Sequence, residues 1–327
     1  MDWFVRLVVI GQSAVFDRTI FPLLQGLGLA RLDGDAYVAT GWLVIGLAQI
    51  ALVWLLLRPL EAWRPVETWT DRRAVRVDVL YTFLERLGLM SLLFFVALQP
   101  AVDWLEVTLR VAARVPYQLD DAVLGQRHHP MLAFVTYAVV LDLLEYARHR
   151  LQHRYAWWWA LHSVHHSQRQ LSFWADDRNH LVDSLLANLW RALAAIAIGV
   201  PGPQFALIVL LTRGIESLSH ANTRLWFGRV GERLVVGPHF HRLHHAIGVG
   251  HEGPAGGCNF ATLLPVWDLL FGTADFRRAA LPTGIRDQLD GADYGRGFWA
   301  QQLRALGRLF AALGPGRRFP AAPGRAR

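Results

Sequence analysis

The feature that most limits the fold is a run of apolar residues long enough to cross a lipid bilayer. Residues 37–57 contain no charged side chain, and a helix needs about 20 such residues to span the hydrocarbon core. Only 18% of the 327 residues are charged, against roughly 25% in an average soluble domain. A disordered protein is excluded by the apolar composition, and a disulfide scaffold by the single cysteine, Cys258. We predict an all-α integral membrane protein.

Other apolar segments predict a bundle of about four to six membrane helices. Residues 79–102 and 131–146 predict a second and a third span. Residues 181–200 and 204–218 predict a shallow helical hairpin, because a Pro-Gly-Pro turn separates them. Residues 3–29 predict an extra or interfacial helix, and no removable signal peptide is expected.

The basic residues are interpreted as charges that orient the protein in the membrane. All 33 are arginine and the net charge is +7, but they mostly flank apolar runs, so no nucleic-acid partner is expected. The absence of lysine suggests a GC-rich, bacterial source, and hence the bacterial inner membrane. Five arginines lie between residues 58 and 78, which predicts a cytoplasmic loop. Counting spans from that loop puts every histidine from His149 onward on the cytoplasmic side, and His128 and His129 on the other.

Eight histidines fall into three clusters with ligand spacing. They are His149 and His153; His162, His165 and His166; and His241, His244 and His245. Residues three or four apart share a helix face. Eight imidazoles exceed one coordination site, so two metal ions are predicted, and imidazole suits zinc, copper, iron and nickel alike. His180 and His220 are candidates for two further ligands.

The blocks around these clusters resemble the fatty acid hydroxylase / sterol desaturase superfamily. The similar segments are residues 142–167, the His220-Ala221-Asn222 block, residues 238–245, Asn259-Phe260 and residues 267–273. The resemblance covers about residues 130–275. It implies residues 131–275 as a catalytic domain with a histidine-rich helical cap. Residues 1–130 are predicted from their apolar runs as N-terminal membrane helices. Residues 276–327 are predicted as a basic tail with an amphipathic helix.

The resemblance implies a membrane-bound di-iron oxygenase that uses O₂ to hydroxylate or desaturate a lipid C–H bond. The eight clustered histidines would hold two iron ions, with His180 and His220 as further candidates. The chain departs from the family pattern at Ala246, where serine is more usual, and at Gly257-Cys258, where an acidic residue is expected. Unactivated C–H cleavage needs a metal–oxygen oxidant, so the metal would carry the hard step.

Several polar residues are predicted to support the ligands. Asp142 and Glu145 share a helix face with His149, and we expect them to orient ligands or to pair with Arg150 or Arg154. Asn222, two residues after His220, is predicted to act in the same way.

Three other features lie near the histidine clusters in the sequence. Glu216 lies four residues before His220 and is a candidate carboxylate ligand. The Trp157–Trp159 run predicts an interfacial belt. The glycine-rich segment 248–257 is expected to let the chain pass close to the metals.

No haem, flavin or nicotinamide motif is found, so a separate electron donor is predicted: a reductase, a ferredoxin or a cytochrome. The lipid substrate stays open. An alternative is a zinc-dependent membrane hydrolase, although the sequence lacks HExxH. A metal transporter or a haem-binding membrane protein is a weaker alternative, because the histidines lie at span ends rather than at mid-membrane depth.

Overall fold

The computed structural model describes residues 2–112, 119, 129–251 and 256–314. These residues form helices and connecting loops, with no β-strand among them beyond one antiparallel bridge between Ala246 and Thr283. The predicted all-α membrane bundle is thereby confirmed. Of the predicted features, His128 and residues 315–327 of the tail lie outside the described part. His129 directly precedes α8 (Pro130–Arg154).

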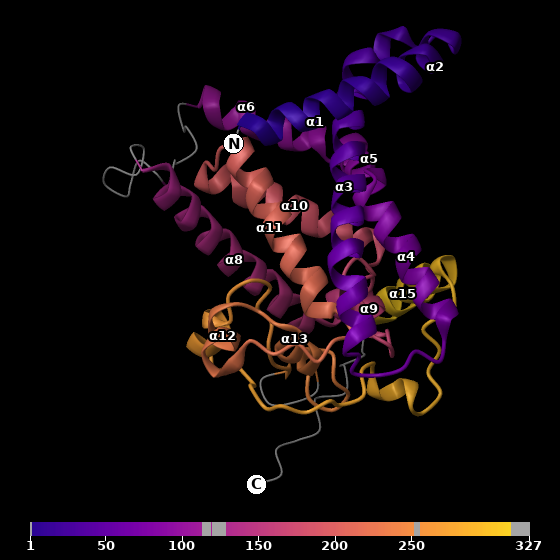
Figure 1. The fold of residues 1–327 in the computed structure, drawn as a ribbon, viewed down its shortest axis with the longest axis vertical. Coiled ribbons are helices and arrows are strands. Elements are labelled where there is room, and N and C mark those ends of the chain that lie inside the picture. The colour runs from indigo at the N-terminus through magenta and orange to yellow at the C-terminus, as the bar shows by residue number, and fades with distance from the viewer. Residues whose placement is uncertain (1, 113–118, 120–128, 252–255, 315–327) are drawn as a thin grey trace.

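Four helical segments in the described residues are long and apolar enough to cross a membrane. They are Arg6–Gly26, Ala30–Trp63, Pro130–Arg154 and Leu181–Ile198. The first is built from α1 (Asp2–Val15), a π-helical stretch (Phe16–Ile20) and α2 (Phe21–Gly26). The chain then turns into α3 (Asp33–Trp63), which lies beside α1 (Figure 1). The N-terminal segment is therefore a candidate span in its own right.

The second predicted span, residues 79–102, is wrong as a single helix. The chain forms α4 (Arg72–Arg86), α5 (Leu89–Ala97) and α6 (Gln99–Val111) instead. The break lies at Gly88, whose φ of +94° is a left-handed conformation that a helix interior does not allow. Together α4 and α5 still carry the chain away from the loop that follows α3 (Figure 1).

The later helices form the half of the molecule that holds the histidines. They are α8 (Pro130–Arg154), α9 (Ala156–His166), α10 (Leu181–Ile198), α11 (Gly202–His220), α12 (Gly228–Leu234), α13 (Pro238–His244), α14 (Val266–Leu270) and α15 (Phe298–Leu313). The hairpin turns at Gly199, which has a φ of +66°. Helix α8 runs eight residues beyond the predicted end at 146, so the first histidine pair lies on the helix itself.

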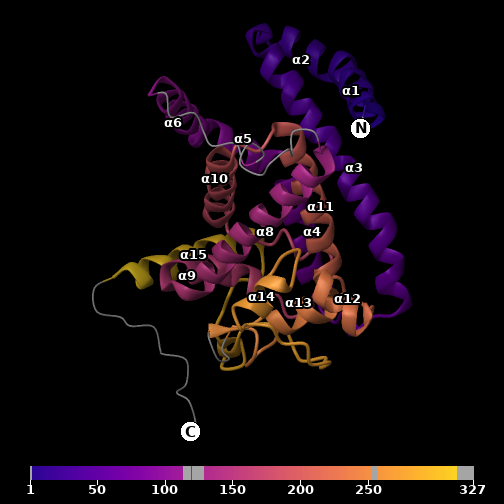
Figure 2. The same cartoon turned by 90° about the vertical axis from the view of Figure 1, so that its left-hand side faces the viewer.

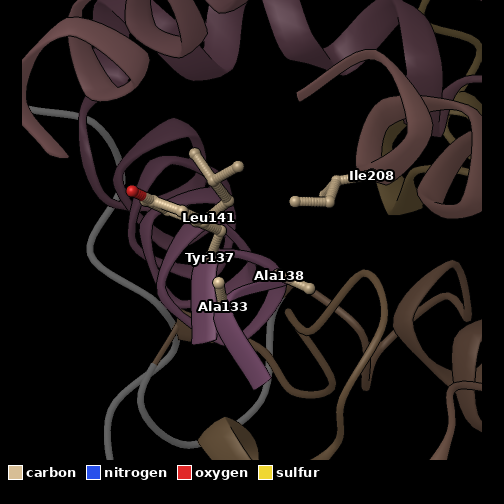
Figure 3. Close-up of a cluster of buried hydrophobic side chains, with 5 residues drawn as sticks. All are labelled: Ala133, Tyr137, Ala138, Leu141 and Ile208. Carbon is tan, nitrogen blue, oxygen red and sulfur yellow. The ribbon is translucent and has the colours of Figure 1, made fainter. Parts of the chain in front are cut away.

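Helix α8 packs on α11 through apolar side chains. Ala133, Tyr137, Ala138 and Leu141 of α8 form one buried cluster with Ile208 of α11 (Figure 3). Helices α9 and α15 lie side by side and run across the direction of α10 (Figure 2). Helix α15 buries Phe298 and Ala305 and exposes Trp299 and Phe310. Its packing fixes α9, which carries three of the histidines.

Candidate metal centre

Nine buried or half-buried histidines form two groups. Group A consists of His149, His153, His162, His166 and His244, and group B of His165, His220, His241 and His245. Within each group, one ring nitrogen from every residue lies within 4.8 Å of all the others. The two groups therefore bring together all eight histidines of the predicted clusters, and His220 joins them.

Helical spacing distributes the histidines between the groups in a regular way. Each pair four residues apart stays together: 149 with 153 and 162 with 166 in group A, and 241 with 245 in group B. The remaining histidine of each HxxHH cluster, His165 or His244, joins the other group. Adjacent residues on a helix point about 100° apart, so one short helix can supply ligands to two neighbouring ions.

The nitrogens of group B converge on one point. The Nε2 atom of His220 lies 3.0 Å from that of His241 and 3.2 Å from those of His165 and His245, and the His241 and His245 Nε2 atoms are 3.1 Å apart. Ligand nitrogens about 2.0–2.1 Å from a shared metal ion lie about 2.8–3.4 Å apart at angles of 90–109°. The spacing in group B therefore fits one metal ion.

Backbone carbonyls fix the tautomer of three of the grouped histidines. The Nδ1 atom lies 2.8 Å from the carbonyl oxygen of Phe260 in His149, of Cys258 in His244 and of Glu216 in His220. A carbonyl only accepts, so Nδ1 donates in each ring and the neutral imidazole has its free lone pair on Nε2. This is the hydrogen bond to the second nitrogen that orients metal-bound histidines.

The side chain of Asp183 does the same for His162. Its carboxylate lies 3.2 Å from His162 Nδ1 and accepts hydrogen bonds from Trp158 Nε1 at 2.7 Å and Gln152 Nε2 at 2.9 Å. Asp183 lies in the first turn of α10, so the predicted hairpin supplies a residue that orients a histidine. Trp158 is therefore a buried hydrogen-bond donor rather than part of an interfacial belt.

The lone pairs aimed into group A have no protein partner. The Nε2 atoms of His149, His162 and His244 are buried without a hydrogen bond, and neither ring nitrogen of His153 or His166 has one. A buried polar atom without a partner is costly. Burial also lowers the pKa of His244 to about 3 and lowers the pKa of His162, His165 and His166. Neutral, converging imidazoles without partners are the donor set that a metal ion requires, so the residues fit two ions.

The two groups touch. The rings of His166 (group A) and His245 (group B) lie 4.5 Å apart between centroids, and those of His241 and His244 lie 5.1 Å apart. Metals held by these rings would be close neighbours, and a small molecule could contact both. Trp159 lies against group A, 5.0 Å from His153 and 5.2 Å from His166.

His180 does not join either group. It precedes α10, where its Nδ1 accepts from the Val182 amide at 3.1 Å and its Nε2 lies 3.2 Å from the Gln302 carbonyl. Both nitrogens are used in capping α10 and in holding α15. The predicted ligand set is therefore corrected by the loss of His180.

Asp142 holds a loop rather than a histidine. Its carboxylate accepts from the amides of Leu263 and Leu264, each at 3.0 Å, and from Trp267 Nε1 at 2.8 Å. That loop follows Phe260, whose carbonyl faces His149. Asp142 thus acts on the ligand through the loop, and it pairs with neither Arg150 nor Arg154.

Glu145 and Asn222 also have partners other than those predicted. Glu145 pairs with Arg148 at 2.8 Å and lies 3.7 Å from Arg191. The Asn222 side chain binds the backbone of the loop after α3, with its Oδ1 3.1 Å from the amide of Glu67. Because Asn222 follows His220, this contact places the arginine-rich loop at the same end of the bundle as the histidines.

Two of the three carbonyls, those of Cys258 and Phe260, follow directly on the glycine-rich segment, whose Gly250 packs against the end of α13. At Gly250 a Cβ atom would lie 1.7 Å from the His244 carbonyl oxygen, and at Gly257 it would lie 2.3 Å from the Gly250 carbonyl oxygen. Only glycine allows these approaches. The sequence predicts that the glycine-rich segment passes close to the histidines. It does not predict the contacts of the Cys258 and Phe260 carbonyls, because any residue type has a backbone carbonyl.

A cavity of about 90 Å³ reaches both groups. It is lined by His149 and His162 of group A and by His165, His220 and His241 of group B. The rest of its wall is polar and includes Arg191, Arg213 and Glu216. Glu216 is not among the residues of either group.

Residues 134–273 match a family model described as fatty acid hydroxylase. Over this region the chain is similar to the fatty acid hydroxylase family. The resemblance drawn from the sequence blocks is confirmed there, and the match contains all nine grouped histidines. The matched region ends at Thr273, whose hydroxyl donates to Asp268 at 2.6 Å. No solved structure matches the chain.

Proposed function

We propose that the protein is a membrane-bound di-iron oxygenase that uses O₂ and external electrons to hydroxylate or desaturate a lipid C–H bond. The observation that carries the proposal is the pair of adjoining imidazole groups inside a fatty acid hydroxylase region. Bound iron would supply the oxidising power that no side chain has. Four helical segments fit a lipid environment and hence a lipid substrate.

The chain's own residues prepare the site in two ways. The carbonyls of Phe260 and Cys258 hold rings of group A with Nε2 aimed inward, and Asp183 does so for His162. The cavity beside both groups gives a substrate a place to reach them. Orienting ligands and controlling solvent access are what the protein contributes to such chemistry.

The test is elemental analysis of the detergent-purified, iron-supplied chain beside His165→Ala/His166→Ala. That double variant removes one ligand from each group. Two irons per wild-type chain and a loss in the variant are expected, followed by O₂-dependent oxidation of added lipid. Zinc retained under iron-replete expression would favour the hydrolase instead. Metal content unchanged in the variant would contradict the ligand assignment.

The electron donor and the membrane side belong to the same proposal. We infer a separate donor protein, because the sequence has no haem, flavin or nicotinamide motif. We also infer that the histidine end lies on the cytoplasmic side of a bacterial inner membrane. The arginine-rich loop at that end supports this orientation. Arg72→Cys should react with an impermeant thiol reagent in inverted vesicles and not in intact cells; the reverse would refute it.

A further inference from the structure

Two cavities adjoin beside the histidines. The first is the polar cavity that contacts both groups. The second, of about 40 Å³, lies between α8, α10 and α11; Leu141, Phe205 and Ile208 form its apolar part, and Asp142 and Glu145 of α8 also line it. Leu141 and Ile208 face each other across the two helices (Figure 3). Because α8 is a candidate span, the second cavity suits a hydrocarbon chain.

Three charged residues line both cavities: Arg191, Arg213 and Glu216. A chain that passed from the apolar part of the second cavity to the histidines would have to pass these three side chains. A bare methylene chain gains nothing from charged groups and would desolvate them at a cost. A substrate that carries a polar group beside these three side chains would form hydrogen bonds with them and would offset the free-energy cost of desolvation.

The two arginines already have acidic partners. Arg213 lies 3.1 Å from Glu85 and 3.4 Å from Asp177. Arg191 donates to the Asn188 side chain at 2.6 Å and lies 3.7 Å from Glu145. Each guanidinium has five N–H donors, so donors remain for a bound molecule.

The carboxylate of Glu216 differs from these groups. Among the described residues, no side chain forms a hydrogen bond or an ion pair with it; the side chains of Ser219 and His220 bond instead to the Glu216 backbone carbonyl. It is also the one acidic residue that lines both cavities. An unused acceptor beside spare donors fits a neutral group that can both donate and accept. A hydroxyl does both, whereas a cation would be repelled by the two arginines.

We propose that Glu216 binds the hydroxyl of a neutral lipid alcohol and thereby sets which carbon lies beside the histidine groups. The proposal rests on the proposed function, since it names the substrate class of the same site. The hydroxyl donates to the Glu216 carboxylate and accepts from Arg191 or Arg213. The alkyl chain lies in the cavity between α8, α10 and α11.

The test measures binding without turnover. The metal-loaded, detergent-purified full chain is titrated with hexadecanol, its methyl ether and hexadecane, without reductant or O₂, and affinity is read from the ligand-dependent rise in melting temperature. We expect hexadecanol to bind the wild type about tenfold or more tightly than the ether, since a hydrogen bond to a charged group is lost with the ether. Metal content is measured in every sample.

Variants separate the roles open to Glu216. Glu216→Leu should lose the preference for the alcohol, and Glu216→Gln should keep part of it, because its amide oxygen still accepts. Glu106→Leu, at a carboxylate on α6 that lines neither cavity, should keep it. Equal affinity for the alcohol and the ether in the wild type, or an unchanged preference in Glu216→Leu, overturns the proposal. Metal loss in both Glu216 variants overturns it too, since Glu216 would then be a ligand. Because the binding measurement needs no oxidation, it tests the role of Glu216 even if the proposed oxygenase reaction is not observed.

Discussion

At the scale of single residues, four of the nine grouped histidines are oriented through their Nδ1 atoms. Three rings are oriented by backbone carbonyls and one by Asp183. Loss of such a partner commonly weakens metal binding by about 10–100-fold. These contacts distinguish candidate ligands from orienting groups and from histidines outside the groups, a distinction that the histidine spacing alone does not make.

His220 and His180 give a matched pair of tests. His220→Ala removes one of the four converging nitrogens of group B, so we expect the loss of about one metal ion per chain. His180→Ala should keep both ions, because His180 caps α10. Metal-to-protein ratios decide the matter. Equal metal loss in the two variants would contradict the division into groups.

Asp183→Asn tests the orientation of His162. The amide keeps the size of the carboxylate but can present an N–H to Nδ1, which would favour the wrong tautomer. We expect metal affinity in group A to fall by about 10–100-fold while group B keeps its ion. A chelator competition titration measures this, with the half-exposed Asp293→Asn as the control. An affinity equal to that of the control would show that Asp183 has no effect on the ligand.

At the scale of helices and loops, the short helices α9 and α13 carry clustered histidines, and their positions are fixed by the elements that pack against them. Helix α9 lies between α8, α10 and α15, and α13 has the glycine-rich loop packed on it. The carboxylate of Asp142 joins α8 to the loop before α14. That loop carries the Phe260 carbonyl, so packing between elements is transmitted to His149.

Asp142→Ala should therefore affect stability and metal binding together. It leaves the amides of Leu263 and Leu264 and the Trp267 indole N–H without their acceptor, at a cost of about 3 kcal/mol or more. We expect a lower melting temperature and weaker metal binding in group A. Asp103→Ala, at an exposed residue of α6, should change neither. An unchanged melting temperature in Asp142→Ala would show that the loop does not depend on this carboxylate.

The sequence predicts the parts of this site that depend on local periodicity. Histidines at positions i, i+3 and i+4 reveal ligand clusters, and apolar runs reveal α3 and α8. The contacts between distant segments leave no such trace: the carbonyls of Cys258 and Phe260 could belong to any residue type. The break at Gly88 was equally hidden, since a glycine inside an apolar run is also found in continuous membrane helices.

At the scale of the whole molecule, the histidine groups put many neutral imidazoles into one buried region. Burial lowers the pKa of His244 to about 3 and lowers the pKa of His165, His166 and His245. In the unfolded chain these rings protonate near pH 6.5. The unfolded state therefore binds more protons below that pH, and the folded state loses stability as the pH falls.

We expect the metal-free protein to be most stable above about pH 6.5 and to lose stability progressively as the pH falls toward 3. Bound metal should be released over the same range, because protons compete for the same lone pairs. Melting temperature and retained metal after dialysis at stepped pH values measure both effects. A flat melting temperature from pH 7.5 to 4 would contradict the buried, neutral state of the rings.

The division of ligands among α8, α9, α11 and α13 also bears on how the protein is made. Group A cannot be complete until His244 has been synthesised, nor group B until His245. All four candidate spans precede these residues in the chain. If insertion into the bilayer begins during synthesis, it begins on a polypeptide that has not yet assembled its histidine groups, and metal binding would then be a late event in maturation rather than a guide for the earlier helices.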